Sequence, residues 1–230
     1  MDLQFFVDVF LRRPWLHSTA YGFLITAAFF YKKLNISGRS LVHIVGIYGI
    51  HTLVCSHLSI SKIETSWTFN LICMPLTWMI VKLLTDNLSD KKFIKLFRYI
   101  TIICISVHIL NISFFQGIRY IATYSYLTLQ AVNAIVAFYY LKDQMDSSDR
   151  HPSLNVLNWF AAATLIDHIT SIPITATLSQ DMIGFADRRY ASFLFSIMSF
   201  VYGCWYLIIS AGIIWNKTAL SSRFLSRSSP

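Results

Sequence analysis

Long apolar segments alternate with short polar ones along the whole sequence. A helix that crosses a bilayer needs roughly 20 mainly apolar residues, and seven segments approach that length. Aromatic residues such as Trp15, Tyr99 and Trp215 stand at segment ends, where amphipathic rings favour the headgroup zone. The pattern predicts an all-α, polytopic membrane helical bundle of about seven transmembrane helices, which cover residues 15–31, 40–60, 65–84, 99–115, 120–141, 154–177 and 191–215.

Composition supports the membrane class. The 230 residues are 55% hydrophobic and 13% charged, with a mean hydropathy of +0.54, whereas soluble domains carry about 25% charged residues. The net charge of +8 raises the question of nucleic acid. The basic residues, however, lie beside apolar segments, where they act as topology signals. The predicted partner is therefore the lipid bilayer, with its anionic headgroups, and no nucleic acid.

The distribution of lysine and arginine predicts the orientation, because cytoplasmic loops are enriched in these residues. Six lie in the N-terminal segment and the even-numbered loops: Arg12, Arg13, Lys62, Arg119, Arg188 and Arg189. The other 13 of the 19 lie in the odd-numbered loops, the adjoining end of the third span and the C-terminal tail. We therefore expect the N-terminus outside and the C-terminus in the cytoplasm, although Arg12 and Arg13 oppose this orientation.

The chain divides into three parts. Residues 1–14 hold apolar side chains at helical spacing, which predicts an N-terminal interfacial segment or a loosely packed end. Residues 15–217 form the seven-helix transmembrane domain. Residues 218–230 are Ser-rich and basic, which is typical of a disordered cytoplasmic tail.

Ionisable groups inside a membrane are costly, so they are the first candidates for function. Five polar residues lie near the middle of predicted spans: His51, His108, Gln130, Asp167 and His168. Their similar depth suggests a common ligand or proton-relay site.

Further polar residues extend these positions into stripes at three- and four-residue spacing, which places them on one helix face. Such faces should point toward protein or water, and they predict a bundle with a polar interior layer. The stripes are Asn70, Cys73 and Thr77; Thr101, Cys104, His108 and Asn111; Thr123, Tyr126, Gln130 and Asn133; and Thr164, Asp167 or His168, and Ser171.

Asp167 is the only acid deep in a predicted span. A carboxylate there should pair or hold its proton, and His51, His108 or His168 offers a partner that titrates near neutrality. The alternative is a structural role, because polar side chains join membrane helices through hydrogen bonds worth about 0.6–2 kcal/mol. That alternative is favoured for Asn70, Asn111 and Asn133, and for Gln130.

Other chemistries have weaker support. The four cysteines form no CxxC pair, and His51, His108, Asp167 and His168 lack a metal-site spacing. His43 and His57 are 14 positions apart, as haem ligation would need, but a matching histidine pair is missing. The last span has no lysine for retinal, and no hydrolase motif is found. We predict no catalytic residue, metal or cofactor, and the sequence favours a protein that is not an enzyme.

Several segments resemble a known group. The run from Glu64 to Pro75, the Lys91–Lys92 pair, the Leu157-Asn-Trp-Phe160 sequence and an aromatic, Ser-rich last span are similar to uncharacterised small seven-helix integral membrane proteins of Bacteroidetes-type bacteria. That resemblance implies a multi-pass protein of the bacterial inner membrane and no particular activity. Such proteins often carry a glutamate just after the proline, whereas Leu76 and Thr77 follow Pro75 here.

Three functions fit the sequence. The first is a sensory or accessory membrane protein that binds a signal or lipid and passes a helix shift to a separate membrane or cytoplasmic signalling partner. The second is a small-solute or proton-coupled transporter with a midplane Asp/His site. The third is a membrane redox or metal-dependent enzyme.

Overall fold

The described part of the chain consists of α-helices joined by short connections. The structure is a computed structural model that describes residues 14–60, 66–117, 123–146, 155–181 and 188–227. Within these ranges it has seven α-helices and no strand, which confirms the predicted all-α class. The predicted interfacial segment lies outside the described residues except for Pro14. The helices are α2 (Pro14–Phe30), α3 (Ile36–Ile60), α4 (Ser66–Thr85), α5 (Lys91–Leu110), α6 (Thr123–Asp146), α7 (Val156–Asp181) and α8 (Arg188–Arg227).

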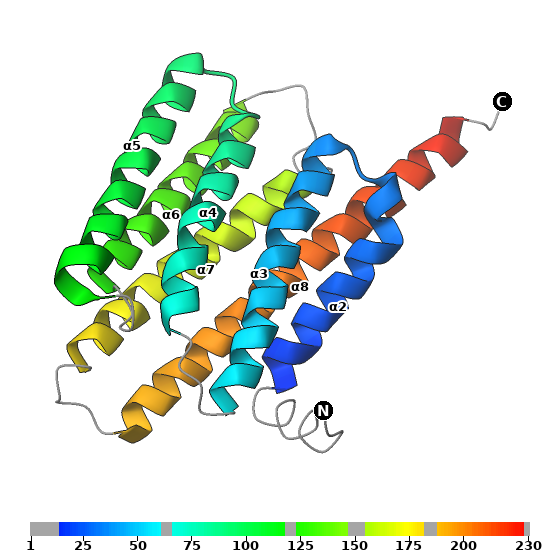
Figure 1. The fold of residues 1–230 in the computed structure, drawn as a ribbon. Coiled ribbons are helices and arrows are strands. Elements are labelled where there is room, and N and C mark those ends of the chain that lie inside the picture. Colours follow the sequence, from blue (N-terminus) through cyan, green and yellow to red (C-terminus); the bar gives the residue numbers. More distant parts are fainter. Residues whose placement is uncertain (1–13, 61–65, 118–122, 147–154, 182–187, 228–230) are drawn as a thin grey trace.

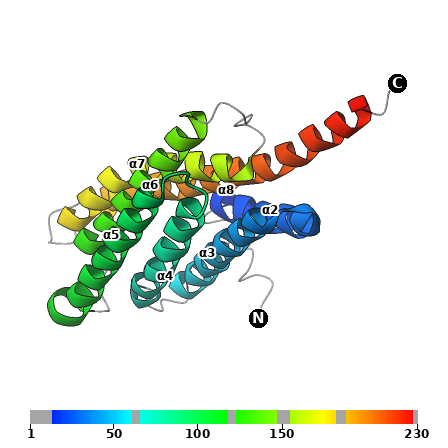
Figure 2. The ribbon, with the colours of Figure 1, turned by 90° about the horizontal axis from the view of Figure 1, so that it is seen from above.

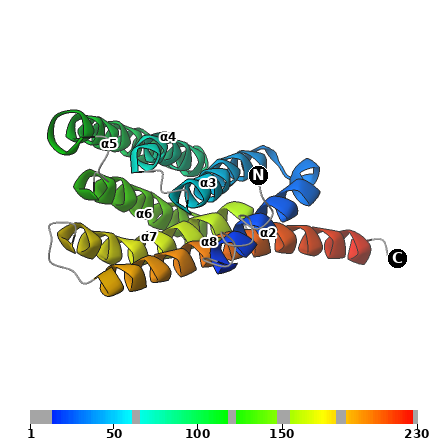
Figure 3. The ribbon, with the colours of Figure 1, turned by 60° about the horizontal axis from the view of Figure 1, so that its bottom comes forward.

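Successive helices run in opposite directions (Figure 1). The last turns of α2, α4 and α6 lie at the same end of the bundle as the last turns of α8. Helices α3, α4 and α5 lie along one side and α7 and α8 along the other, with α6 between them (Figure 3). The C-terminal end of α8 projects beyond the other helices (Figure 2).

Three described helices are long and apolar enough to cross a membrane, over Trp67–Thr85, Lys91–Gln116 and Ser196–Asn216. The sequence predicted seven. Helix α2 has only 17 residues, and α6 and α7 carry polar residues along their length. In α7, for example, Asn158, Asp167 and His168 lower the mean hydropathy. The polar residues near the middle of these two helices, among them Gln130, Asn133 and Asp167, are buried. In α3, several side chains from Ser56 onward lie outside the described residues, which shortens the stretch that can be assessed.

Two helices extend beyond the predicted spans. Helix α5 begins at Lys91 instead of Tyr99, because Asp90 caps it by accepting a hydrogen bond from the Lys92 main-chain N–H at 2.8 Å. Helix α8 continues to Arg227, through most of the segment for which the sequence predicted a disordered tail. The sequence after Gly212 contains no glycine, and no proline before Pro230, that would end the helix.

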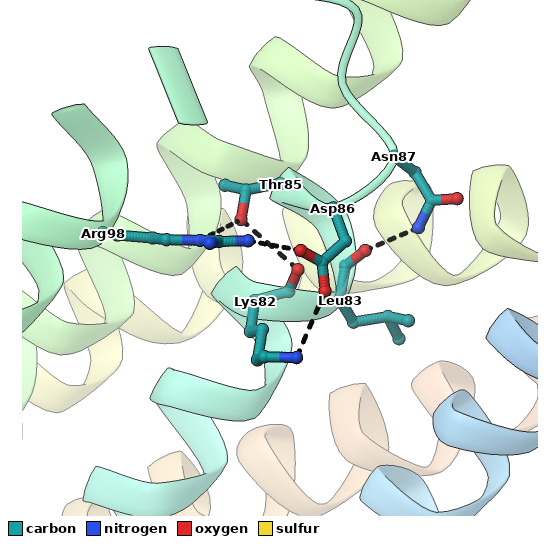
Figure 4. Close-up of polar contacts among 6 residues, drawn as sticks. All are labelled: Lys82, Leu83, Thr85, Asp86, Asn87 and Arg98. Carbon is teal, nitrogen blue, oxygen red and sulfur yellow. Dashed lines mark hydrogen bonds and ion pairs between the residues drawn. The ribbon is translucent and has the colours of Figure 1, made fainter. Parts of the chain in front are cut away.

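A cluster of polar contacts joins the end of α4 to α5 (Figure 4). Asp86 forms ion pairs with Lys82, at 3.3 Å, and with Arg98 of α5. Arg98 also donates through Nε to Thr85 Oγ1 at 3.3 Å, and Asn87 donates to the Leu83 carbonyl at 2.8 Å. Exposed ion pairs each contribute about 0–1 kcal/mol, so this cluster mainly fixes the turn between the two helices.

Two glycines let α8 pack closely on both neighbours. Gly203 and Gly212 are nine residues apart, which places them on opposite faces of a helix with 3.6 residues per turn. Gly203 lies against the indole of Trp15 in α2, and Gly212 lies 2.5 Å from Trp159 Cβ in α7, measured from an ideal Cβ built on the glycine. Helix α8 is therefore held between α2 and α7 at positions where no side chain fits.

Candidate functional site

A cavity of about 50 Å³ lies inside the bundle, between five helices. It has room for roughly three to five water molecules or a ligand of similar size. Its walls come from α3, α4, α6, α7 and α8. The polar lining residues are Cys73, Thr77, Gln130, Asn133, Thr164, Asp167 and His168, and the aromatic ones are Tyr48, Tyr126, Tyr202 and Trp205.

The predicted polar stripes explain much of this lining. On α6, Gln130 is 1% exposed and Asn133 is 4% exposed; on α7, Thr164 and Ser171 are 1% exposed and Asp167 is 5% exposed. The prediction that these stripes face the protein interior is therefore confirmed.

The carboxylate of Asp167 has few partners. Among the described residues, its Oδ1 accepts no hydrogen bond, and its Oδ2 lies 3.6 Å from His168 Nδ1. That separation is too long for a hydrogen bond. Both ring nitrogens of His168 are likewise buried without a hydrogen-bond partner among those residues. Asp167 and His168 thus present unused polar atoms in a buried place, where leaving them unmatched costs free energy.

Two amide side chains extend this set of acceptors. Gln130 donates through Nε2 to Ser171 Oγ at 3.2 Å, and Asn133 donates through Nδ2 to Thr77 Oγ1 at 3.3 Å. Within the described part of the chain, Gln130 Oε1 and Asn133 Oδ1 accept no hydrogen bond. The amide nitrogens therefore join helices, and the amide oxygens remain as acceptors beside Asp167 Oδ1.

His108 lies in a different sector of the bundle. Its Nδ1 is 2.8 Å from Ser125 Oγ, and its Nε2 is 3.2 Å from the Asn70 carbonyl oxygen and 3.3 Å from Cys73 Sγ. A carbonyl only accepts, so this pairing suits a proton on Nε2 and a hydroxyl donating to Nδ1. His108 is a buried link between α4, α5 and α6, and it touches the cavity only through Cys73.

His51 is also separate from the cavity. Its Nε2 lies 3.3 Å from Cys55 Sγ, and Cys55 Sγ lies 3.2 Å from Thr68 Oγ1 of α4. The predicted five-residue site therefore divides: Gln130, Asp167 and His168 come together, whereas His51 and His108 each join other helices. The residues that the structure describes also contain no group of three His, Cys, Asp or Glu side chains placed to hold a metal.

The haem hypothesis has no further support from His43. Its Nε2 lies 2.8 Å from the Tyr31 hydroxyl, and the side chain is exposed. The side chain of His57 is outside the described residues.

The sequence did not single out Tyr48, Tyr202 and Trp205 as site residues. Tyrosine and tryptophan in membrane proteins usually stand near the interfaces, and these three lie mid-helix beside Asp167 instead. Their unusual depth is the signal that would have identified them.

Comparison with protein-family models, with curated proteins and with solved structures finds no match to this chain.

Proposed function

We propose that all seven described helices cross a bacterial inner membrane and that the chain is a multi-pass protein. The supporting observation concerns α6 and α7, whose mean hydropathy is too low for them to count as candidate membrane spans. On both helices, apolar side chains are exposed and polar side chains are buried, the reverse of the usual distribution in a soluble protein. On α7, Ile166 and Ile169 are 52% and 60% exposed while Asp167 is buried. On α6, Ile135 and Phe138 are 56% and 57% exposed while Gln130 is buried. Apolar residues outside and polar residues inside suit a lipid solvent.

The same protein would have its N-terminus outside and its C-terminus in the cytoplasm. The basic residues Lys33, Lys91 and Lys142 belong to helix ends that lie together at one end of the bundle, which would face the cytoplasm.

A cysteine-accessibility experiment tests this orientation. In spheroplasts, we expect a membrane-impermeant maleimide to label Phe115→Cys, at the opposite end, and to label Lys91→Cys only after permeabilisation. The side chains of Lys91 and Phe115 are both exposed, and that of Phe115 is 82% exposed. Labelling of the unmodified protein, which has four native cysteines, gives the background signal. The reverse pattern would invert the orientation, and labelling of both before permeabilisation would contradict a spanning bundle.

The function that the geometry supports best is a sensory membrane protein. A small ligand would bind at the Asp167 cavity and shift the helices around it, and a separate partner would detect the shift. The observation that carries this proposal is the cavity itself. Five helices contribute to its walls, so a change in its contents acts on most of the bundle at once.

Cross-linking in native membranes tests the sensory proposal. We expect a specific partner to be captured by wild type and by Asp146→Asn, in which an exposed acid at the end of α6 is changed. In Asp167→Asn, we expect the captured amount to change about fivefold or more, because couplings between sites usually have at least that size. No specific partner, or a partner that captures equally in all three proteins, would contradict the proposal.

A proton-coupled transporter is the second candidate. It is favoured by the adjacent acid and base, Asp167 and His168, at 3.6 Å, and by Pro173 inside α7. Proline removes a main-chain hydrogen bond and allows a kink, which would give α7 a bending point one to two turns from Asp167. Solute-driven proton movement in reconstituted vesicles that is lost in Asp167→Asn would place this candidate first.

A further inference from the structure

The aromatic side of the cavity has a defined geometry. Tyr48 of α3 lies edge-on to both Tyr202 and Trp205 of α8, with ring centroids 5.9 and 5.5 Å apart. The Trp205 indole is held in place because its Nε1–H donates to Thr164 Oγ1 at 3.3 Å. Tyr126 of α6 completes this side. These four residues are called the aromatic wall below.

The aromatic wall and Asp167 belong to one cavity. All five side chains line it. A molecule in the cavity therefore meets aromatic rings and a carboxylate at the same time.

The unmatched oxygens of the cavity define the charge of a suitable ligand. Asp167 Oδ1, Gln130 Oε1 and Asn133 Oδ1 are all acceptors that lack a hydrogen-bond partner among the described residues. Asp167, Gln130 and Asn133 are each at most 5% exposed. These acceptors belong to side chains that line one cavity, so they make its surroundings favourable to a positive charge and unfavourable to a phosphate or carboxylate.

The size and the wall narrow the choice among cations. Small inorganic cations such as Ca²⁺ and Mg²⁺ require six or more oxygen ligands, whereas four of the side chains here are aromatic. Alkylated ammonium ions, in contrast, are attracted to the faces of tryptophan and tyrosine rings. A cavity of about 50 Å³ has room for roughly three to five non-hydrogen atoms.

We propose that the cavity binds a small organic ammonium ion, with its charge beside the Asp167 carboxylate and its carbon atoms against the aromatic wall. This assignment names the class of ligand that the proposed sensory protein would detect. The biological role of the binding rests on the proposed function, whereas the binding itself does not.

The experiment uses full-length protein in mild detergent and isothermal titration calorimetry with three probes. Tetramethylammonium and methylammonium are cations of suitable size, and tert-butanol is a neutral match for tetramethylammonium with the same number of non-hydrogen atoms. Sodium chloride at equal ionic strength controls for salt. We expect tetramethylammonium to bind about tenfold or more tightly than tert-butanol, because a desolvated cation gains from both carboxylate and rings.

Variants separate the two halves of the site. Asp167→Asn keeps the side-chain volume and should reduce the preference for tetramethylammonium over tert-butanol to about threefold or less. Trp205→Phe keeps an aromatic face and should bind within about threefold of wild type, whereas Trp205→Leu should bind about tenfold more weakly. Asp146→Asn, which changes an exposed acid outside the cavity, should behave as wild type.

Several results would overturn the assignment. These are equal binding of the cation and tert-butanol, no cation binding at all, and an unchanged preference in Asp167→Asn. If Trp205→Leu fails to fold, the Asp167→Asn result still decides the question. Cation binding without an Asp167-dependent partner would remove the sensory function alone, and an Asp167-dependent partner without cation binding would remove the ligand class alone.

Discussion

Replacing Asp167 with leucine should make the protein more stable, by about 1–3 kcal/mol in the free energy of unfolding. Asp167 is 5% exposed, its Oδ1 has no hydrogen-bond partner among the described residues, and its Oδ2 is 3.6 Å from His168 Nδ1. Its burial therefore costs free energy, and no hydrogen bond to Oδ1 from the described residues offsets that cost. Leucine has a similar size and no such cost. Thermal or denaturant unfolding of purified protein in detergent measures the difference.

Gln130→Leu is the matched control, because Gln130 lines the same cavity but makes a hydrogen bond between helices. Its amide donates to Ser171 Oγ, which in turn donates to the Asp167 main-chain oxygen at 2.6 Å. We expect this variant to lose about 0.6–2 kcal/mol. If Asp167→Leu also lost stability, Asp167 would be a structural link of the same kind, and the ligand role proposed for it would lose its physical basis. A gain would agree with a group kept for function at the expense of stability.

The polar interior was predictable from the sequence because helical spacing alone determines which residues share a face. Gln130 and Asn133 are three positions apart on α6, and Asp167 and Ser171 are four apart on α7. All four are buried as expected. The stripe that contains His108 also faces inward. The depth of a residue along its helix, and the helix face on which it lies, can therefore be predicted from the sequence alone.

Which stripes meet could not be predicted, because packing between helices determines their rotation and position. His51 and His108 match Asp167 in depth along their spans, but His51 lies between α3 and α4 and His108 between α4, α5 and α6. Conversely, Tyr48 and Tyr202 come from helices at opposite ends of the sequence and meet at the cavity. Such contacts depend on how the complete surfaces of two helices fit together, which the spacing of polar residues on one helix does not determine.

Changing Gly212 to alanine should destabilise the bundle by about 1–3 kcal/mol, the usual cost of forcing an extra group into a packed interface. An alanine Cβ at this position would lie 2.5 Å from Trp159 Cβ and 2.6 Å from its Cγ. The Cβ is attached directly to the main chain of α7 and cannot move by a side-chain rotation, so α7 and α8 must separate. Both helices contribute walls to the Asp167 cavity, which means that the same change should weaken tetramethylammonium binding.

Gly46→Ala provides the matched control for Gly212→Ala, since both replace a glycine inside a helix. A Cβ on Gly46 meets nothing within 4 Å, so alanine should leave stability unchanged or raise it by up to about 1 kcal/mol through its better helix propensity.

The stability of Gly203→Ala should fall between those of the Gly46 and Gly212 variants. Its Cβ would meet the outer edge of the Trp15 indole, which can rotate away if it gives up its hydrogen bond to the Phe200 carbonyl. Equal stability of the Gly46 and Gly212 variants, measured side by side in detergent, would show that α7 and α8 are not in close contact at Gly212. Unfolding that follows the predicted order would instead identify the α7–α8 contact as the support of the cavity, because Asp167 and Trp205 lie on those two helices.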